Sequence, residues 1–161
     1  MAEKIRVGVV GAGFMGGMHT NCYVAAPGAE LVAVCDVRQE AAEKLAGPHK
    51  AKAYTDADKM LAEAGLDMVD ICLPTNMHCD YVVRAAKAGK HVLCEKPIAT
   101  SVAEANKMIA ATKKAGVQFM IAQVIRFWPE YMVLKQYVAE GKLGKLLSLQ
   151  MTRISPRPTW S

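Results

Sequence analysis

The sequence predicts an α/β fold built on a doubly wound parallel sheet with helices on both faces. Strand-like and helix-like stretches alternate along the chain with short connections, which is the pattern of parallel strands joined by right-handed crossovers. Several strand-like runs are apolar over most of their length, as expected where helices cover both faces of a sheet. The first run leads into a glycine-rich turn, from Gly11 to Gly16, which is typical of a dinucleotide-binding sheet of the Rossmann type.

Six short segments are predicted as strands, and helices are expected between them. The strands are 4–10, 30–36, 51–54, 67–73, 91–94 and 117–122. Three predicted helices carry capping signals, with a polar residue or a proline at the start and a glycine after the last turn. They are 77–88, between Asn76 and Gly89; 102–115, between a Ser101–Glu104 capping box and Gly116; and 129–140, which begins with Pro129 and ends before Gly141.

The composition is that of a globular domain and argues against several classes of partner. Apolar residues make up 52% of the 161 residues and charged residues 22%, which is ordinary for such a domain. No apolar run approaches the ~20 residues that cross a bilayer, and no signal peptide is visible, so we expect a cytoplasmic protein without a membrane partner. The net charge of +5 is spread rather than clustered, which argues against nucleic acid and suits an anionic cofactor.

Neither the cysteines nor the remaining histidines form a metal or redox motif. The cysteines, at positions 22, 35, 72, 79 and 94, include no C-x-x-C pair and have no histidine partner at zinc spacing. We interpret them as small apolar residues in a reducing compartment. His19, His49 and His91 also lack partners at ligand spacing. The sequence therefore predicts no metal site and leaves these three histidines unassigned.

The three glycines of the turn have separate tasks. Gly11 permits the tight turn, Gly13 lets the backbone approach a pyrophosphate, and Gly16 lets the following helix pack close to the strand. The N–H groups and the positive dipole end of that helix then face the phosphates. We count all three glycines among the cofactor-binding residues, together with Phe14 and Met15 inside the turn.

Asp36 is a second signal for a dinucleotide, because it lies 20 residues after Gly16 at the end of the apolar run 31–35. An acidic side chain at this point can accept hydrogen bonds from the ribose hydroxyls of an adenosine. Asp36 favours NAD, since its carboxylate would repel a 2′-phosphate. Arg38, two residues later, keeps NADP as the alternative.

A further candidate segment follows the strand predicted at 67–73. Because this strand is expected beside the first one, its exit loop should run alongside the bound dinucleotide. The loop residues counted as cofactor-binding are Leu73, Pro74, Thr75, Asn76 and His78. Helix capping alone would explain Asn76, and it does not exclude cofactor contact. His78 could line the cleft, although an isolated histidine is more often structural than catalytic.

The last candidate segment, Glu95-Lys96-Pro97, comes directly after the strand predicted at 91–94. This exit faces the nicotinamide half of a dinucleotide, where a lysine can hydrogen-bond a substrate hydroxyl or carbonyl oxygen. Its ammonium would stabilise the negative charge that develops as hydride leaves or arrives. Pro97 is expected to hold the loop rigidly, with a cis Lys96–Pro97 bond as the alternative to the commoner trans form.

Taken together, these motifs resemble the Gfo/Idh/MocA oxidoreductases, a family that includes glucose–fructose oxidoreductase and inositol 2-dehydrogenase. The segments that carry the resemblance are the G-A-G-F-M-G turn, Asp36, the P-T-N-M-H loop, Glu95-Lys96-Pro97, Arg126-Phe127-Trp128-Pro129 and 140–144. The resemblance implies NAD, or NADP, on the glycine turn and Lys96 as the catalytic residue. It also places Glu95, Lys96, Pro97 and the 74–78 loop beside the cofactor, with Arg126 near the nicotinamide end.

The activity implied is hydride transfer between a nicotinamide cofactor and a secondary alcohol of a sugar, inositol or related polyol, in a homo-oligomer. Two other functions stay open. One is a non-catalytic NAD(P)-binding sensor or regulatory module. The more distant one is a methyltransferase, which also holds an adenosine on a glycine loop, although the Glu95-Lys96-Pro97 segment argues against it.

The resemblance also implies a second α/β domain, which in the family supplies the substrate wall and a catalytic histidine and aspartate. No histidine follows His91, and the segment 147–152 alternates apolar and polar residues as a half-buried strand does. We therefore expect residues 1–124 to form the dinucleotide-binding domain. Residues 125–161 are expected to hold a linking helix and the first strand of a truncated second α/β domain.

Overall fold

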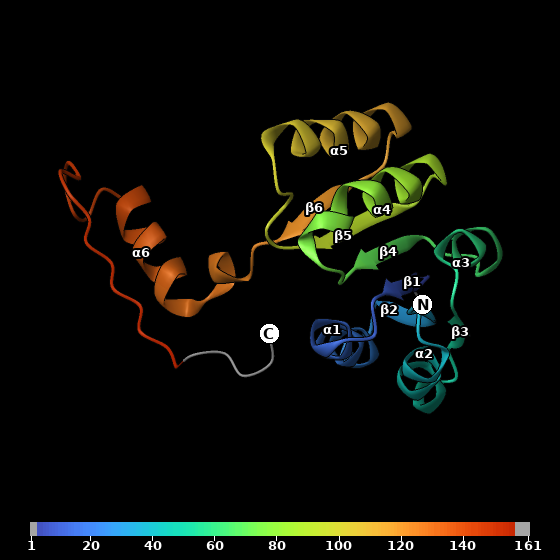
Figure 1. Ribbon diagram of the computed structural model, residues 1–161. Coiled ribbons are helices and arrows are strands. Elements are labelled where there is room, and N and C mark those ends of the chain that lie inside the picture. Colours follow the sequence, from blue (N-terminus) through green and yellow to red (C-terminus); the bar gives the residue numbers. More distant parts are fainter. Residues whose placement is uncertain (1–2, 157–161) are drawn as a thin grey trace. The chain divides into compact units, whose positions relative to one another are not determined.

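The computed structural model describes residues 3–156, and most of them form one parallel sheet flanked by helices (Figure 1). The strands are β1 (Ile5–Val10), β2 (Ala29–Cys35), β3 (Lys52–Tyr54), β4 (Met68–Ile71), β5 (His91–Glu95) and β6 (Phe119–Ala122). They lie in the order β3-β2-β1-β4-β5-β6. All neighbouring pairs run parallel, which confirms the predicted doubly wound sheet. The order reverses between β1 and β4, the switch point where ligands bind in such sheets.

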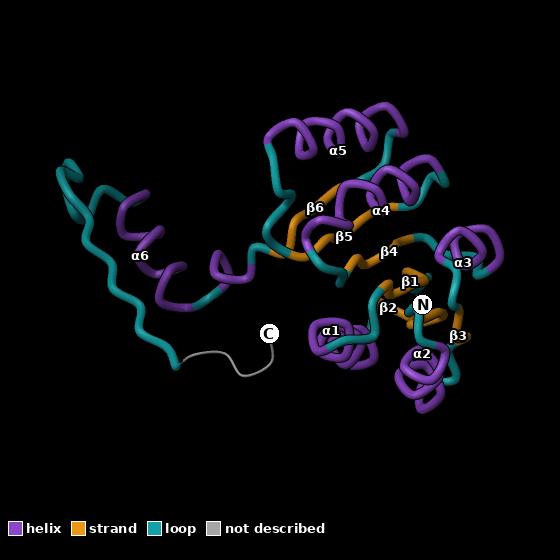
Figure 2. The backbone as a smooth tube through the Cα atoms, in the orientation of Figure 1, coloured by secondary structure: helices purple, strands orange, loops and turns teal. Residues whose placement is uncertain are grey.

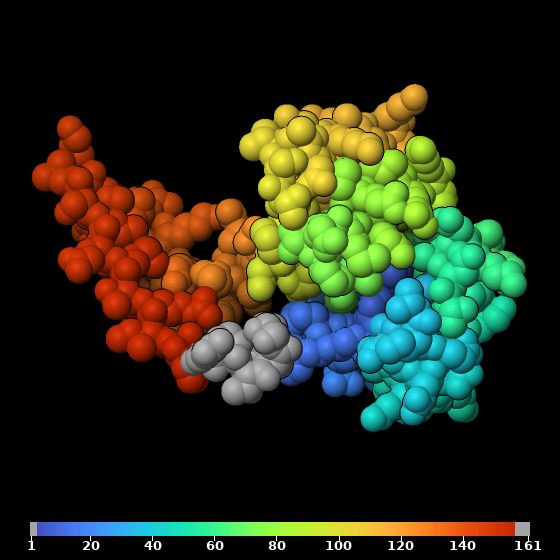
Figure 3. Space-filling model, viewed as in Figure 1, coloured from blue at the N-terminus to red at the C-terminus, as the bar shows by residue number. Residues whose placement is uncertain are grey.

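Helices cover both faces of the sheet. On one face lie α1 (Phe14–Ala25) and α2 (Gln39–Ala46), and on the other lie α4 (Thr75–Lys87) and α5 (Val102–Ala115), as Figures 1 and 2 show. The connections also contain α3 (Ala57–Glu63) and a 3-10 turn, η1 (Gly47–His49). In the space-filling view the side chains of α4 (green) and α5 (yellow) form one continuous surface (Figure 3). Within the described residues, no helix has both the length and the apolar character needed to cross a bilayer.

Each face of the sheet has its own apolar core, because successive side chains of a strand point to opposite faces. Val10 and Ile71 belong with Met108 of α5 to the larger core. Val9 belongs with Ala46 of α2 to the smaller one. Burial on both faces is the reason that the strands read as continuous apolar runs.

The capping signals are confirmed at α5 and at α6 (Pro129–Ala139), but the start predicted for α4 is wrong. Ser101 is the N-cap of α5, and its Oγ accepts the Glu104 N–H at 3.2 Å. The N-cap of α4 is Pro74 rather than Asn76, which lies inside the first turn. Pro74 has φ −56° and ψ 144°. This extended ψ is typical of an N-cap residue, and the helix begins with the next residue, Thr75.

The described residues divide into two compact units, which part between Ala122 and Gln123. The second unit contains the 3-10 turn η2 (Val124–Phe127) and α6. The strand predicted at 147–152 is not formed, since residues 145–156 lie in neither a helix nor a strand. A strand needs a neighbour to pair with its backbone N–H and C=O groups, and the one sheet of the described residues belongs to the first unit.

Candidate functional site

Packing within the chain requires two of the glycines in the turn after β1. Gly11 has φ +100°, and a Cβ built there would clash with the carbonyl oxygen of Cys72. A Cβ built on Gly16 would clash with the carbonyl oxygen of Gly11. The turn is therefore held against the end of β4 on one side and against the start of α1 on the other.

Gly13 differs, because packing within the chain does not require a glycine there. It is exposed, and a Cβ built on it would meet no atom of the described chain within 4 Å. Gly13 is also the N-cap of α1; a glycine has no side chain that could cap the helix, and no acidic residue lies in the first turn. A glycine at the positive end of a helix fits the pyrophosphate expected from the sequence. Phe14 and Met15 begin the helix and keep accessible surface.

Asp36 follows β2 and is bonded to the glycine turn. Its Oδ2 accepts the backbone N–H of Ala12 at 2.9 Å, and its Oδ1 accepts that of Arg38 at 2.9 Å. Partial burial opposes ionisation of the carboxyl, but the hydrogen bonds outweigh it and lower the pKa of Asp36. The ionised carboxylate has further lone pairs for other donors. It can therefore still accept ribose hydroxyls.

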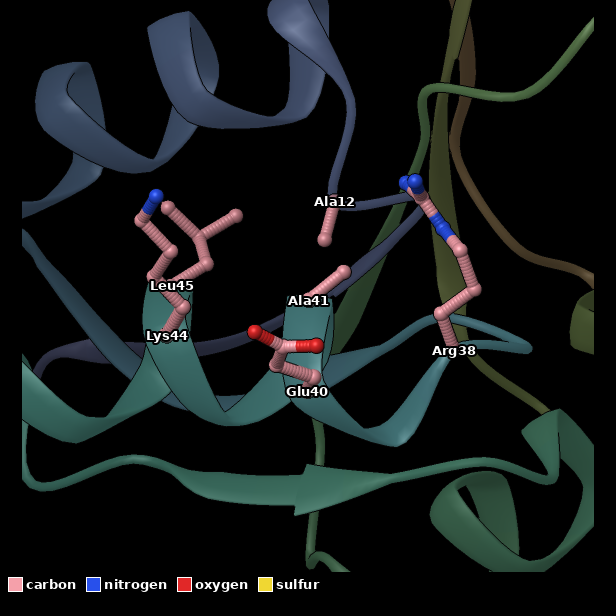
Figure 4. A pocket seen from close by; sticks show the side chains of 6 residues that line it. All are labelled: Ala12, Arg38, Glu40, Ala41, Lys44 and Leu45. Atoms are coloured by element: carbon pink, nitrogen blue, oxygen red, sulfur yellow. The ribbon is translucent and has the colours of Figure 1, made fainter.

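An open pocket of about 510 Å³ adjoins the two residues that bond to Asp36 (Figure 4). Its lining consists of Ala12, Arg38, Glu40, Ala41, Lys44 and Leu45. Figure 4 shows Arg38 on one side of the Ala12 methyl group and Lys44 on the other. The sequence did not single out Lys44, because one lysine on a surface helix carries no signal. Glu40 lies between the two cations, and Arg38 is paired with Asp36 at 3.3 Å, so the pocket by itself does not favour NADP.

His78 joins the loop after β4 to the turn after β5. Its Nδ1 lies 3.0 Å from the carbonyl oxygen of Pro97, and its Nε2 lies 2.8 Å from that of Leu73. His78 is fully buried, so it cannot line an open cleft, and the structure favours the structural role over direct cofactor contact. The other candidate residues of this loop, Leu73, Pro74, Thr75 and Asn76, keep accessible surface.

Lys96 follows β5 at the same edge of the sheet as the glycine turn and Asp36, because the strands that carry them run parallel. Glu95, the last residue of β5, is 6% exposed, and its Oε2 accepts the backbone N–H of Lys96 at 3.0 Å. Lys96 itself is exposed, and the Lys96–Pro97 bond is cis. The chain thus holds the Lys96 backbone and leaves its side chain accessible.

A polar cluster beneath this edge was not predicted. His19 of α1 lies between two carboxylates, with its Nδ1 2.7 Å from Asp70 Oδ2 and its Nε2 3.1 Å from Glu95 Oε1. Asp70 is fully buried and also accepts the Tyr23 hydroxyl at 2.8 Å. The hydrogen bond to Asp70 and the charges of both carboxylates outweigh burial and raise the pKa of His19.

Two signals in the sequence could have found this cluster. His19 follows Gly16 by three residues, which places both on the helix face that packs on the sheet. Asp70 interrupts an apolar run predicted as a buried strand, and a buried charge needs a partner. Spacing rules for ligands compare neighbours along the chain, whereas the partners of His19 come from distant strands.

Among the described residues, His19, Asp70 and Cys72 are the cluster whose ligand atoms lie close enough together to suggest a metal ion. The direct hydrogen bond between His19 and Asp70 leaves no space for an ion between them. Burial and the charge of Asp70 raise the pKa of the Cys72 thiol, which disfavours the thiolate that binds metals. This cluster is therefore better described as a hydrogen-bonded network.

Arg126 lies in η2, in the second unit. It is exposed, and it lines a pocket of that unit with Phe127 and residues of α6. Its expected place near the nicotinamide stays a prediction.

Comparison with known proteins gives a family and a partial overlap. The model of an oxidoreductase family with an NAD-binding Rossmann fold matches residues 5–123. The chain is 37% identical over 158 residues to the myo-inositol 2-dehydrogenase of Thermotoga maritima, and the match covers 96% of this chain and 46% of that protein. It is 32% identical over 159 residues to the levoglucosan dehydrogenase of Pseudarthrobacter phenanthrenivorans, with 93% and 41% covered.

A solved structure agrees with these relatives. The WlbA dehydrogenase from Bordetella pertussis, in complex with NADH and UDP-GlcNAcA, superposes with a TM-score of 0.86 at 29% identity, over 90% of this chain and 42% of that one. The chain spans less than half the length of the relatives it matches.

Proposed function

The chain belongs to the Gfo/Idh/MocA oxidoreductase family, and from this premise we propose that the complete protein transfers hydride between NAD and a secondary alcohol. The substrate class is a sugar, inositol or related polyol, and this chain carries the cofactor-binding half. The family match supplies the NAD-binding Rossmann domain, at residues 5–123. The substrate class is supported by relatives named for myo-inositol and levoglucosan.

The observation that carries the proposal is the place of Lys96. Its backbone is bonded to Glu95 at the carboxyl end of β5, one strand away from the switch point beside β4. Its side chain is exposed at the edge where the glycine turn and Asp36 also lie. A lysine so placed can donate a hydrogen bond to the reacting hydroxyl and stabilise the charge that develops on its oxygen.

The other residues of this edge bind and orient the cofactor. The N–H groups beyond Gly13 hold the pyrophosphate, and Asp36 accepts the ribose hydroxyls. The loop from Leu73 to Asn76 runs along the dinucleotide. When bound, the nicotinamide ring accepts or supplies the hydride, while the protein supplies orientation and electrostatics.

Residues 125–161 belong in this proposal to the start of the substrate domain, and Arg126 faces the nicotinamide end. The rest of that domain supplies the substrate wall and the general base. The complete enzyme is a cytoplasmic homo-oligomer. The substrate domain, the place of Arg126 and the homo-oligomer follow from the family resemblance, whereas the cytoplasmic location follows from the composition and from the interpretation of the cysteines as those of a reducing compartment.

Replacing Lys96 by alanine in the full-length protein tests the proposal. We expect kcat on a polyol to fall about 10²-fold, as for the loss of one electrostatic donor, while the Kd for NADH changes by less than about threefold. Lys107→Ala is the matched control, because Lys107 is an exposed lysine on α5. Equal losses in kcat and in NADH affinity would make Lys96 a cofactor-binding residue and contradict the proposal.

A further inference from the structure

We propose that His19 and His78 are positioning residues for Lys96. His19 contacts Glu95, the residue before Lys96, and His78 contacts Pro97, the residue after it. The inference rests on the role proposed for Lys96 and adds a role for two side chains that this function does not otherwise use. A lysine carries its charge on a flexible four-carbon stem. The protein can therefore direct the ammonium mainly by fixing the backbone from which the stem starts.

His19 holds the residue before Lys96. Its Nε2 lies 3.1 Å from Oε1 of Glu95, whose other oxygen accepts the Lys96 N–H at 3.0 Å. On its other side, Nδ1 lies 2.7 Å from Asp70, which is itself fixed by the Tyr23 hydroxyl. A continuous chain of hydrogen bonds thus runs from buried β4 to the Lys96 backbone.

His78 holds the residue after Lys96. Its Nδ1 lies 3.0 Å from the Pro97 carbonyl oxygen, and its Nε2 lies 2.8 Å from the Leu73 carbonyl oxygen. Both contacts are to backbone oxygens, so they act on the path of the chain and not on a side chain. A neutral ring donates to one of these two oxygens, and the proposal assigns that hydrogen bond to Nδ1 and the Pro97 oxygen. The ring is fully buried, which shields this hydrogen bond from competing water.

The two histidines connect Lys96 to the segments that are proposed to hold the cofactor. His19 belongs to α1, the helix that begins at the glycine turn, and His78 belongs to α4, the helix that begins after Leu73-Pro74. Holding a reacting group within about 0.5 Å of its working position takes supporting residues that are themselves fixed. These two helices supply them.

The charge on His19 is set by groups from several elements. Asp70 of β4 and Glu95 of β5 face its two nitrogens, Cys72 Sγ lies 3.4 Å from Nδ1, and Tyr23 shares Asp70 from the same helix. The two carboxylates outweigh burial and raise the pKa of His19. An imidazolium can donate to both carboxylates at once, whereas a neutral ring can donate to only one of them.

Two substitutions of His19 separate its two bonds. The amide of asparagine places an N–H near the position of Nδ1, and that of glutamine places one near Nε2. His19→Asn therefore keeps a donor for Asp70, whereas His19→Gln keeps a donor for Glu95. The readout is the ¹³C-methyl resonance of Lys96 in the reductively dimethylated 161-residue chain, assigned by its loss in Lys96→Arg.

We expect His19→Asn to shift the Lys96 resonance and His19→Gln to leave it at the wild-type position. Thermal unfolding should show the opposite order, with His19→Gln the less stable variant, because Asp70 then loses its histidine donor. If the Lys96 resonance shifts most in the less stable variant, or if neither variant shifts it, the role of His19 is merely structural and the proposal is overturned.

If both variants fail to fold, the protonation of the two histidines in the wild-type chain tests the proposal instead. The proposal requires a proton on Nε2 of His19 and on Nδ1 of His78, which long-range ¹H–¹⁵N spectra report directly. A lone pair at either nitrogen at neutral pH overturns it. The comparison of the histidine variants is made without cofactor and tests only the positioning role. NADH is then added to the wild-type chain, and a Lys96 resonance that does not respond to NADH would contradict the proposed function.

Discussion

A glycine is needed at position 13 for cofactor binding and at position 16 for packing, and an alanine at each position should separate the two effects. Gly13→Ala should keep the fold, since its Cβ meets no atom of the described residues within 4 Å, but should weaken NADH binding at least tenfold by obstructing the approach to the helix N-terminus. Gly16→Ala should instead lower stability, because its Cβ clashes with the Gly11 carbonyl. Fluorescence titration with NADH and thermal unfolding measure the two effects. Tight NADH binding by Gly13→Ala would contradict the assignment of the pyrophosphate site.

Asp36 should decide between the two nicotinamide cofactors. Asp36→Asn removes the charge that repels a 2′-phosphate and leaves Arg38 without its carboxylate partner. We expect the NADH affinity to fall roughly tenfold, as for the loss of a hydrogen bond to a charged group, and the ratio of NADPH to NADH affinity to rise. Asp58→Asn, an exposed aspartate on α3, is the control. An unchanged ratio of the two Kd values would exclude Asp36 as the discriminating residue.

His19 should make stability depend on pH in a defined direction. Its pKa is raised in the folded chain, mainly by the hydrogen bond to Asp70, so the protonated ring favours folding. This contribution is complete below the unfolded pKa of about 6.5 and is lost as pH rises through the higher folded pKa. Urea unfolding of the wild type from pH 6 to 9 should show the decline. His19→Gln should flatten the curve in that window, and an unchanged slope would argue against a charged His19.

The residues of the site differ in how far the sequence reveals them. Asp36 ends a predicted strand, and Gly11 and Lys96 follow predicted strands, so local pattern alone brings them to one edge of the sheet. The bond between His19 and Asp70 joins residues 51 positions apart, and no local pattern carries such a pairing. His78 was identified, but whether it faced the cleft or the interior depended on packing that spacing does not encode.

At the scale of elements, the capping of α5 offers a direct test of local stabilisation. Ser101→Ala removes the acceptor for the Glu104 N–H and should cost about 1 kcal/mol, which is about 2–4 °C in Tm for a chain of this size. Ser148→Ala, at an exposed position outside the helices, should leave Tm unchanged. A Ser101→Ala variant with wild-type Tm would mean that tertiary packing alone holds the start of this helix.

The strands were predicted well because burial on both faces makes them continuous apolar runs that glycine and polar residues interrupt. The alternation at 147–152 was a weaker guide. The alternation shows that the segment would have one apolar and one polar face as a strand. A strand also needs a neighbouring strand to pair with, and the described residues of the second unit contain no sheet that offers one. The start of α4 was misplaced because Asn76 is a good capping residue by type, whereas the chain leaves the extended conformation already at Pro74, the N-cap.

For the whole molecule, we expect the 161-residue chain to bind NADH but not to oxidise myo-inositol at a measurable rate. The residues proposed to bind the cofactor lie mainly in the first unit, whereas the substrate wall and the general base are expected from the second domain. Isothermal titration with NADH and a coupled dehydrogenase assay on the same preparation separate the two activities. Steady turnover of a polyol by this chain would contradict the assignment of the substrate wall and the general base to the second domain.

The bond from Ala12 to Asp36 has a consequence for how the two ends of the adenosine diphosphate moiety are recognised. It joins the loop that receives the phosphates to the side chain that receives the ribose. The two subsites therefore form one rigid unit, and a disturbance of either should be felt at the other. Losses of affinity from substitutions at Gly13 and Asp36 should consequently not add in a double-mutant cycle, and the shortfall would measure how strongly this one hydrogen bond couples them.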